Sequence, residues 1–372
     1  MNAKKNQIVQ ETYDQWVTAG KPPIATFATE IGMPRNTVKR WLLEVYPKLT
    51  KINPFVVKAK STLYDIDGNA KLTWVKESLD ERLADAAIKE FIAGLVEGAR
   101  GLSPAIPAPT HCNADLLAVY PQGDPHLGLL AMESETGANF DLKIAEQLMC
   151  AAIDRLVASA PDAETGLILE LGDLLHSDNQ TNRTPQSGHQ LDVDSRWTKV
   201  MQVGLRTMVY CINRVMSKHK KVIVRLVQGT HDSHSAFALA LALDAYYHNN
   251  ERVKIDLSPA VFWYYDFGNT LIGCTHGDSC KSDNLPSIMA ADQPVLWGAS
   301  KFRYWYHGHI HHNSVKEFPG CMVESFRTLA GKDAWHAASG YRSGRSMSMI
   351  VHHKLYGEVE RHTADISMLT AA

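Results

Sequence analysis

The chain has 372 residues, of which 45% are hydrophobic and 21% are charged, and its net charge is −2. This composition excludes extensive disorder, and the length exceeds what a single hydrophobic core usually holds. No apolar run approaches the roughly 18 residues that a membrane span needs, and the polar N-terminus has no secretory pattern. We therefore expect a cytoplasmic protein with more than one domain and no membrane partner.

The charge is unevenly distributed along the chain. Residues 1–60 hold ten Lys and Arg against four acids, a net charge of +6, so the remainder carries −8. The basic segment 1–60 favours binding of a polyanion, and the acidic remainder favours binding of divalent cations. The six cysteines form no Cys-x-x-Cys pair, which favours reduced thiols over a zinc or redox site.

The first 50 residues predict short helices joined by a tight turn. Apolar residues recur at helical spacing over Ile24–Ile31, Gly32 breaks the run, and the same spacing returns over Val38–Val45. This pattern indicates a helix-turn-helix domain over residues 1–50. The second helix would then present to DNA the residues Arg35, Asn36, Thr37, Lys39 and Arg40. The same packing is also typical of a helical module that binds another protein.

We expect residues 51–112 to connect the two domains. We expect a hairpin over Thr62–Glu77, a helix over Leu79–Leu102 and a proline-containing linker over Ser103–Thr110.

The second predicted domain covers residues 113–372, where short apolar runs alternate with longer helical stretches, as in an α/β layered domain. Predicted strands are Leu116–Tyr120, Leu167–Leu171, Val222–Val227, Val253–Leu257, Val261–Phe267 and Leu271–Thr275, with a hairpin near Leu355–Gly357. Predicted helices are Asp141–Ala158 and Asp194–Lys218.

Five of the expected strands end in a loop that contains glycine together with Asp or His. The loops are Gly123-Asp124-Pro125-His126, Gly172-Asp173-Leu174-Leu175-His176, Gly229-Thr230-His231-Asp232, Thr275-His276-Gly277-Asp278 and Gly308-His309-Ile310-His311-His312. Loops at the carboxyl ends of strands in an α/β sheet converge on one crevice, so these side chains can meet. Mixed imidazole and carboxylate donors suit Mn, Fe, Zn or Ni better than Mg or Ca.

The order of these motifs resembles the calcineurin-like metallophosphoesterase superfamily. The resemblance covers residues 113 to the C-terminus and implies a layered β-sandwich with flanking helices. Gly172-Asp173-Leu174-Leu175-His176 resembles the double-strand-break repair nucleases, and the N-terminal helix-turn-helix resembles bacteriophage-encoded members, which would act in the cytoplasm of a bacterial host.

The resemblance implies two divalent metal ions, with manganese the leading candidate. It implies that Asp124, His126 and His311 hold one ion, that His276 and His309 hold the other, and that Asp173 bridges them. Two such ions can share a hydroxide that attacks a phosphorus atom.

In this scheme His231 stabilises charge and protonates the leaving oxygen, and Asp232 orients His231. One position departs from the family. Thr230 stands where the superfamily has Asn, and a hydroxyl is a poorer ligand than an amide oxygen, which puts full activity in question.

Several further polar residues near these motifs have either a substrate-contacting or a solvated-surface interpretation. A solvated position is favoured for most residues of the loop after Asp173, namely among His176, Asp178, His189, Asp192 and Asp194. Both interpretations stay open for His234, Arg303, His307, His312, Arg327, His336, Arg342 and Arg345.

The leading functional hypothesis is a metal-dependent phosphodiesterase, in particular a DNA nuclease. One alternative is a DNA-binding phage protein with a catalytically reduced phosphoesterase domain, and another is a nucleotide or phosphoprotein phosphatase. The resemblance to repair nucleases is also consistent with a homodimer.

Overall fold

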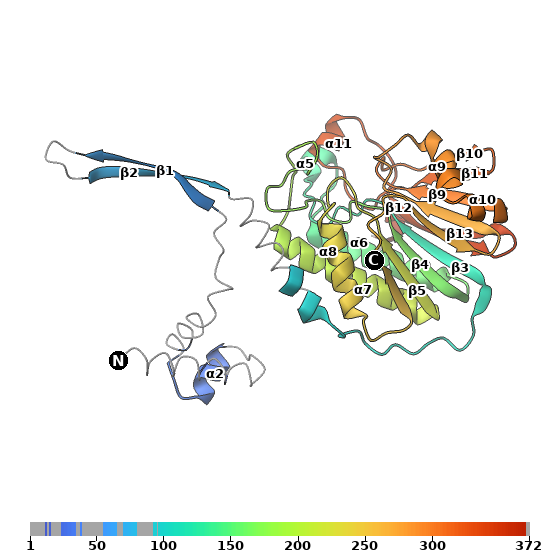
Figure 1. The fold of residues 1–372 in the computed structure, drawn as a ribbon, viewed down its shortest axis with the longest axis horizontal. Coiled ribbons are helices and arrows are strands. Elements are labelled where there is room, and N and C mark those ends of the chain that lie inside the picture. Colours follow the sequence, from blue (N-terminus) through green and yellow to red (C-terminus); the bar gives the residue numbers. More distant parts are fainter. Residues whose placement is uncertain are drawn as a thin grey trace. The chain divides into compact units, whose positions relative to one another are not determined.

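The computed structural model describes residues 12, 15, 24–34, 38, 55–64, 70–79, 92–94 and 96–369. Two compact units make up the chain, residues 1–93 and 94–372 (Figure 1). Among the described residues, no helix is both long enough and apolar enough to cross a membrane.

One helix of the first unit is described within the segment expected to form a helix-turn-helix. Helix α2 (Ile24–Glu30) is followed by a turn in which Gly32 has a φ of 66°, a backbone conformation that favours glycine. Phe27 and Ala28 of this helix pack with Val38 in a small buried cluster. The DNA-contact candidates Arg35, Asn36, Thr37, Lys39 and Arg40 lie outside the described residues.

An antiparallel hairpin also belongs to the first unit. Strand β1 (Phe55–Tyr64) pairs with β2 (Ala70–Leu79). The hairpin expected over Thr62–Glu77 is thus present, with longer strands. Within the helix expected over Leu79–Leu102, residues 92–94 and 96–99 are helical, whereas Leu79 ends strand β2 and residues 100–102 are not helical.

The second unit is built on a six-stranded sheet. Its order is β13 (Gly357–Asp365), β12 (Ser346–His353), β3 (Asn113–Gln122), β4 (Ala163–Glu170), β5 (Lys221–Leu226) and β6 (Val253–Asp256). Strands β3 to β6 run parallel, and β12 is antiparallel to β3. The continuous apolar run of β4 fits this central position, because a central parallel strand is buried on both faces.

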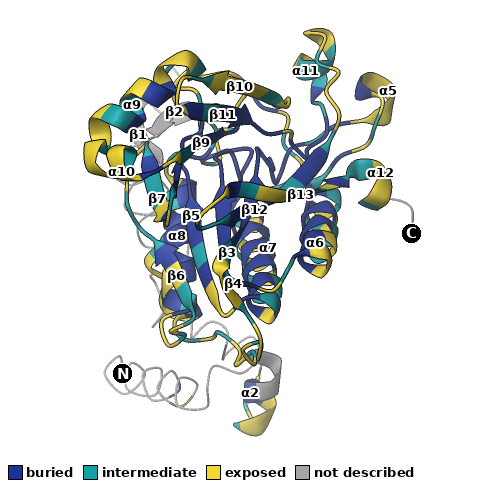
Figure 2. Ribbon diagram, turned by 90° about the vertical axis from the view of Figure 1, so that its right-hand side faces the viewer, coloured by how far each residue is buried: buried dark blue, intermediate teal, exposed yellow. Residues whose placement is uncertain are grey.

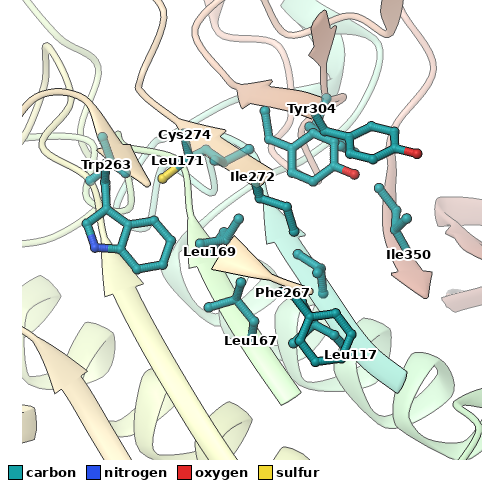
Figure 3. Packing of buried hydrophobic residues seen from close by; sticks show 14 residues of the cluster. Leu117, Leu167, Leu169, Leu171, Trp263, Phe267, Ile272, Cys274, Tyr304 and Ile350 are labelled. Atoms are coloured by element: carbon teal, nitrogen blue, oxygen red, sulfur yellow. The ribbon is translucent and has the colours of Figure 1, made fainter. Parts of the chain in front are cut away.

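A five-stranded sheet packs against one face of the first. Its order is β10 (Ser314–Phe318), β11 (Cys321–Ser325), β9 (Phe302–His307), β8 (Thr270–Cys274) and β7 (Trp263–Phe267). Between the sheets, Leu117, Leu167 and Leu169 of the first meet Phe267 and Ile272 of the second (Figure 3). These residues form one hydrophobic core between the two sheets.

Helices cover the outer faces of both sheets (Figure 2). On the six-stranded sheet lie α6 (Leu142–Ser159), α7 (Trp197–Lys218) and α8 (Ser235–Tyr246), and beside the five-stranded sheet lie α9 (Leu285–Asp292) and α10 (Pro294–Ala299). The short elements are α5 (Glu133–Thr136), η1 (Ser282–Asn284), α11 (Ala334–Ala338) and α12 (Ile366–Leu369). The α/β sandwich with flanking helices expected from the sequence is confirmed.

Two aspartate carboxylates accept hydrogen bonds from backbone N–H groups at the start of α6. Asp141, the expected start of α6, is its N-cap and accepts a hydrogen bond from the Ile144 backbone N–H at 2.7 Å. Helix α7 begins at Trp197 rather than at the expected Asp194. The Asp194 carboxylate instead accepts from the Leu142 N–H at 3.3 Å, at the start of α6.

Candidate metal centre

The five motif loops meet at the carboxyl ends of β3, β4, β5, β8 and β9. Backbone hydrogen bonds join neighbouring loops. The His126 N–H donates to the Asp173 carbonyl at 3.0 Å, and the Gly308 N–H donates to the His276 carbonyl at 2.9 Å. The parallel strands therefore bring together side chains that are nearly 190 residues apart in the sequence.

One group of possible ligand atoms comes from Asp124, His126 and His311, and all three atoms lie within 4.8 Å of one another. The Nε2 atoms of His126 and His311 are 3.1 Å apart, and His311 Nε2 is 3.5 Å from Asp124 Oδ1. Both Asp124 carboxylate oxygens accept from the His309 N–H at 2.9 Å. This contact fixes the Asp124 carboxylate against the loop that carries the other histidines.

A second group comes from Asp173, His276 and His309. The His276 Nδ1 atom donates to the Leu171 carbonyl at 2.9 Å, so its Nε2 faces the group. That Nε2 lies 3.3 Å from Asp173 Oδ2 and 3.2 Å from His309 Nδ1. Within this second group, His309 is exposed, whereas Asp173 and His276 are buried.

The backbone at these residues is strained. Of the six described non-glycine residues with positive φ, five are predicted ligands: Asp124 (48°), His126 (46°), Asp173 (57°), His309 (69°) and His311 (56°). Left-handed backbone costs an L-residue about 1 kcal/mol or more and persists where the surroundings enforce it. Such strain concentrates at functional sites, and here it aims the side chains of separate loops at one place.

Two glycines make room for the carboxylates. A Cβ atom on Gly229 would lie 2.1 Å from Asp173 Oδ1, and one on Gly308 would lie 2.5 Å from Asp124 Oδ2. Neither position accepts a larger residue without moving a carboxylate. Gly229 and Gly308 therefore leave space for the two carboxylates in addition to allowing the backbone to turn.

The donor set fits cations. In the second group, His276 Nε2 faces both Asp173 Oδ2 and His309 Nδ1. A single proton on this nitrogen cannot form hydrogen bonds to both atoms. Burial, followed by the neighbouring His231, lowers the pKa of His126 well below its ordinary value, which keeps a lone pair free. Burial opposes ionisation of Asp173, but the facing His276 outweighs it and holds the pKa of Asp173 well below its ordinary value. Burial opposes the charged form of His276, but Asp173 and Asp124 outweigh it and raise the pKa of His276 well above its ordinary value. Positive charge is therefore favoured beside these carboxylates, and a divalent transition metal would supply it in place of the proton.

The five motifs, which follow one another along the chain, thus lie together in space at one edge of a sandwich of two sheets. The chain resembles a calcineurin-like metallophosphoesterase.

Comparison with known proteins gives only distant similarities to solved structures. No protein-family model matches the sequence, and no curated protein does. Among solved structures, a Streptococcus pneumoniae protein described as a predicted phosphoesterase is similar at 10% identity, with a TM-score of 0.28, over 67% of this chain and 98% of its own. The zinc complex of Vps29 from Entamoeba histolytica is similar at 14% identity and a TM-score of 0.29, over 67% and 98%. A dimetal phosphatase from Danio rerio is similar at 9% identity and a TM-score of 0.35, again over 67% and 98%. At these scores, the resemblance to metallophosphoesterases rests on the motifs and the geometry of the site.

His231 lies beside these ligand groups. Its Nδ1 donates to the His176 carbonyl at 2.9 Å, and its backbone N–H donates to Asp173 Oδ1 at 2.7 Å. Its ring contacts the His126 ring edge-on, with the centroids 4.7 Å apart. With Nδ1 occupied, Nε2 is the nitrogen left for a ligand.

Asp232 does not orient His231, contrary to the sequence-based prediction. Its buried carboxylate accepts from the Leu175 N–H at 3.0 Å and from the Gly229 N–H at 3.1 Å. It therefore fastens the loop after β5 to the loop after β4. Burial, followed by the charge of Asp173, raises the pKa of Asp232 to about 8. The imidazole of His231 is positioned instead by a backbone carbonyl.

Thr230, at the family's Asn position, faces the second group. Its hydroxyl donates to Asp173 Oδ2 at 3.2 Å. The hydroxyl thereby contacts the carboxylate predicted to bridge the metals.

Two residues after Asp173 depart from the solvated position that the sequence favoured for most of this loop. His176 and Asp178 are both buried. His176 Nδ1 lies 3.2 Å from His126 Nδ1, and His176 forms a third possible ligand group with His126 and His231. The Asp178 carboxylate accepts from the Ser235 N–H at 2.7 Å, at the start of α8. The position of His176 three residues after Asp173 was the available signal.

The remaining candidates divide between the surface and the interior. His189, Asp192 and Asp194 are exposed, as expected for a polar loop. Arg303 was a candidate for phosphate binding, but its guanidinium donates to the carbonyls of Trp297, Ser300 and Gly320, so it holds the end of α10 instead. Arg327 is exposed.

Proposed function

We propose that this chain is a dinuclear-metal-dependent phosphodiesterase that cleaves nucleic acid, in particular DNA. The observation that carries the proposal is the pair of ligand groups on adjoining loops, with His231 beside them. Asp124, His126 and His311 would hold one ion, His276 and His309 the other, and Asp173 would bridge both. When bound, two divalent ions supply positive charge for the phosphate and lower the pKa of the attacking water.

The residues of the chain itself would do the rest. Asp173 is held by the backbone N–H of His231, which couples the bridging carboxylate to the residue that acts on the leaving group. The His176 carbonyl accepts from His231 Nδ1 and fixes the ring, so that the imidazolium form carries its second proton on Nε2 and gives it to the oxygen that leaves phosphorus. The attacking water gives a proton to the solvent, and its oxygen forms the new bond to phosphorus as the bond to the leaving oxygen breaks.

The DNA part of the proposal comes from the N-terminal sequence. A basic segment of net charge +6 with a helix-turn-helix pattern suits a polyanion, and a phosphodiesterase centre acts on the same backbone. Arg35, Asn36, Thr37, Lys39 and Arg40 would contact the DNA. Both units of the chain then serve one substrate.

Incubation of the full chain with Mn²⁺ and linear or single-stranded DNA tests this function. We expect cleavage that a chelator abolishes and that falls about 10²-fold or more in His231→Ala, because the leaving oxygen loses its proton donor. His189→Ala, in an exposed loop, is the matched control and should retain full activity. Metal-independent cleavage, or an unchanged rate in His231→Ala, would contradict the proposal.

One observation favours a second candidate function. The Thr230 hydroxyl contacts Asp173 where the superfamily has an amide, so the chain could bind DNA while its phosphoesterase domain turns over slowly. Tight, salt-dependent DNA binding without cleavage in Mn²⁺ is the result expected for that alternative. Rapid hydrolysis of nucleotides or phosphoproteins with little DNA affinity would indicate a phosphatase instead.

A further inference from the structure

An aromatic cluster adjoins the metal centre in the segment 333–345, which we call the rim segment. Its helix α11 is capped by Asp333, whose carboxylate accepts from the His336 N–H at 2.7 Å and from His336 Nδ1 at 2.6 Å. Trp335, on the same helix, is 60% exposed, although burial of a large aromatic side chain stabilises a protein. Figure 2 shows α11 at the same end of the second unit as α5, with its exposed surface turned outward.

A continuous series of rings joins Trp335 to the metal centre. The His336 ring stacks on that of the predicted ligand His311, with the centroids 4.9 Å apart and the planes at 20°. Trp335 and Tyr341 each contact His336 edge-on at 5.0 Å, and the two lie 5.7 Å from each other. The exposed indole is therefore fixed, through His336, relative to the position where the phosphate would bind.

The surroundings of this cluster are mostly basic. Residues 327–345 contain four Lys and Arg against the single acid Asp333, which is already paired with His336. Exposed Arg342 donates from one nitrogen to the carbonyls of Ala337 and Tyr341, which places its guanidinium against the end of α11. The nearby helix α5, which contacts α11, contributes the exposed acids Glu133 and Glu135. Positive charge therefore lies on the rim segment itself, and negative charge lies across from it.

We propose that Trp335, supported by His336 and Tyr341, is a stacking platform for a nucleobase of the strand whose phosphate occupies the metal centre. This inference rests on the proposed function and adds the substrate class, unpaired nucleotides. A base inside a duplex has both faces covered, whereas a single-stranded or displaced base exposes one to an aromatic ring. Trp335 thus determines a preference for single-stranded nucleic acid or for frayed ends.

The test compares two single-stranded oligonucleotides of equal length, one with natural bases and one with abasic sugars. The value of kcat/KM in Mn²⁺ is measured for each, and their ratio is compared between the wild-type chain and its variants. Trp335→Ala should lower this ratio about tenfold, because stacking on one aromatic residue is lost, and Trp335→Phe should retain most of it. The matched control is Tyr356→Ala, because Tyr356 is 64% exposed in the turn after β12, beside the start of β3 and so at the opposite end of the sheet.

The outcomes separate this inference from the proposed function. A Trp335→Ala variant that lowers cleavage of both oligonucleotides equally, or of neither, would overturn the platform and leave the nuclease function standing. If the wild-type chain cleaves neither oligonucleotide, the nuclease function fails. Binding of both labelled oligonucleotides, measured by fluorescence anisotropy in chelator, then decides the platform alone. The same tenfold change in the ratio of Kd values would support it, and an unchanged ratio would refute it.

Discussion

Two groups of buried histidines in the second unit have different kinds of partner. Between α7 and the six-stranded sheet, His219 donates from Nδ1 to the Ala163 carbonyl at 2.8 Å and accepts at Nε2 from the Tyr120 hydroxyl at 2.7 Å. At the carboxyl ends of the strands, the nitrogens of His126 and His311 face each other, and the buried Nε2 of His176 has no protein partner. A histidine with both nitrogens satisfied is part of the packing, whereas converging nitrogens indicate a ligand site.

The largest expected effect tests the converging region. Asp173→Ala removes the carboxylate predicted to bridge both groups, so both ions should be lost and phosphodiester hydrolysis should fall by about 10³-fold or more. Metal content by elemental analysis and the hydrolysis rate measure this. Asp192→Ala removes an exposed carboxylate of the neighbouring loop and should change neither quantity. Retention of both ions in Asp173→Ala would show that the two groups bind independently.

The second prediction concerns the satisfied region. Burial lowers the pKa of His219 from 6.5 to about 4. The unfolded chain therefore binds more protons than the folded chain between these values, so stability is complete above pH 6.5 and is lost as the pH falls toward 4. The free energy of unfolding should decrease by up to about 3 kcal/mol from this residue.

Urea unfolding at several pH values measures the slope. His219→Gln should flatten it, and His248→Gln, on the surface, should not. Equal slopes in all three chains would show that His219 does not titrate in this way.

The third prediction tests how tightly the metal centre is packed. Gly229→Ala would place a methyl group 2.1 Å from Asp173 Oδ1, and overpacking of this kind costs about 1–3 kcal/mol. We expect a lower Tm, together with weaker Mn²⁺ binding by calorimetry. Gly298→Ala, in helix α10 with no atom within 4 Å of the new Cβ, should leave metal binding unchanged and raise the Tm slightly. Unaltered metal binding in Gly229→Ala would mean that the Asp173 carboxylate can move freely.

The smallest expected effect distinguishes the two ligand groups from each other. Thr230→Asn supplies an amide oxygen beside Asp173, so the second ion should bind about tenfold more tightly, with a comparable gain in hydrolysis. Metal titration in this variant and in wild type measures the difference. Ser233→Asn, three residues further along the same loop, controls for an added amide. Equal affinities and equal high rates would show that the hydroxyl is an adequate substitute.

The sequence predicted the architecture of the second unit and where its polar side chains gather. Asp124, His126 and Asp173 could be located because each follows an apolar strand and the carboxyl ends of such strands share one edge. Partners set by loop packing could not be predicted. Asp232 and His231 are adjacent in sequence, yet the buried Asp232 carboxylate is closer to the backbone of another loop.

The same limit applies to burial within loops. Nothing in the composition of residues 177–195 separates buried Asp178 from exposed Asp192, because the difference depends on which residues α8 covers. The stacking of His336 on His311 joins segments separated by a strand hairpin, and no periodicity reports it. The DNA-contact residues expected in the first unit remain predictions.

The positive φ values at five predicted ligands also constrain how this protein can change over generations. Asparagine and glycine tolerate left-handed backbone, whereas branched side chains do not. A lineage that no longer needs the metals should therefore first replace these residues with asparagine or glycine, and only later with valine or isoleucine. The strained backbone would outlast the chemistry, so that descendants would keep the shape of the loops after losing their ions.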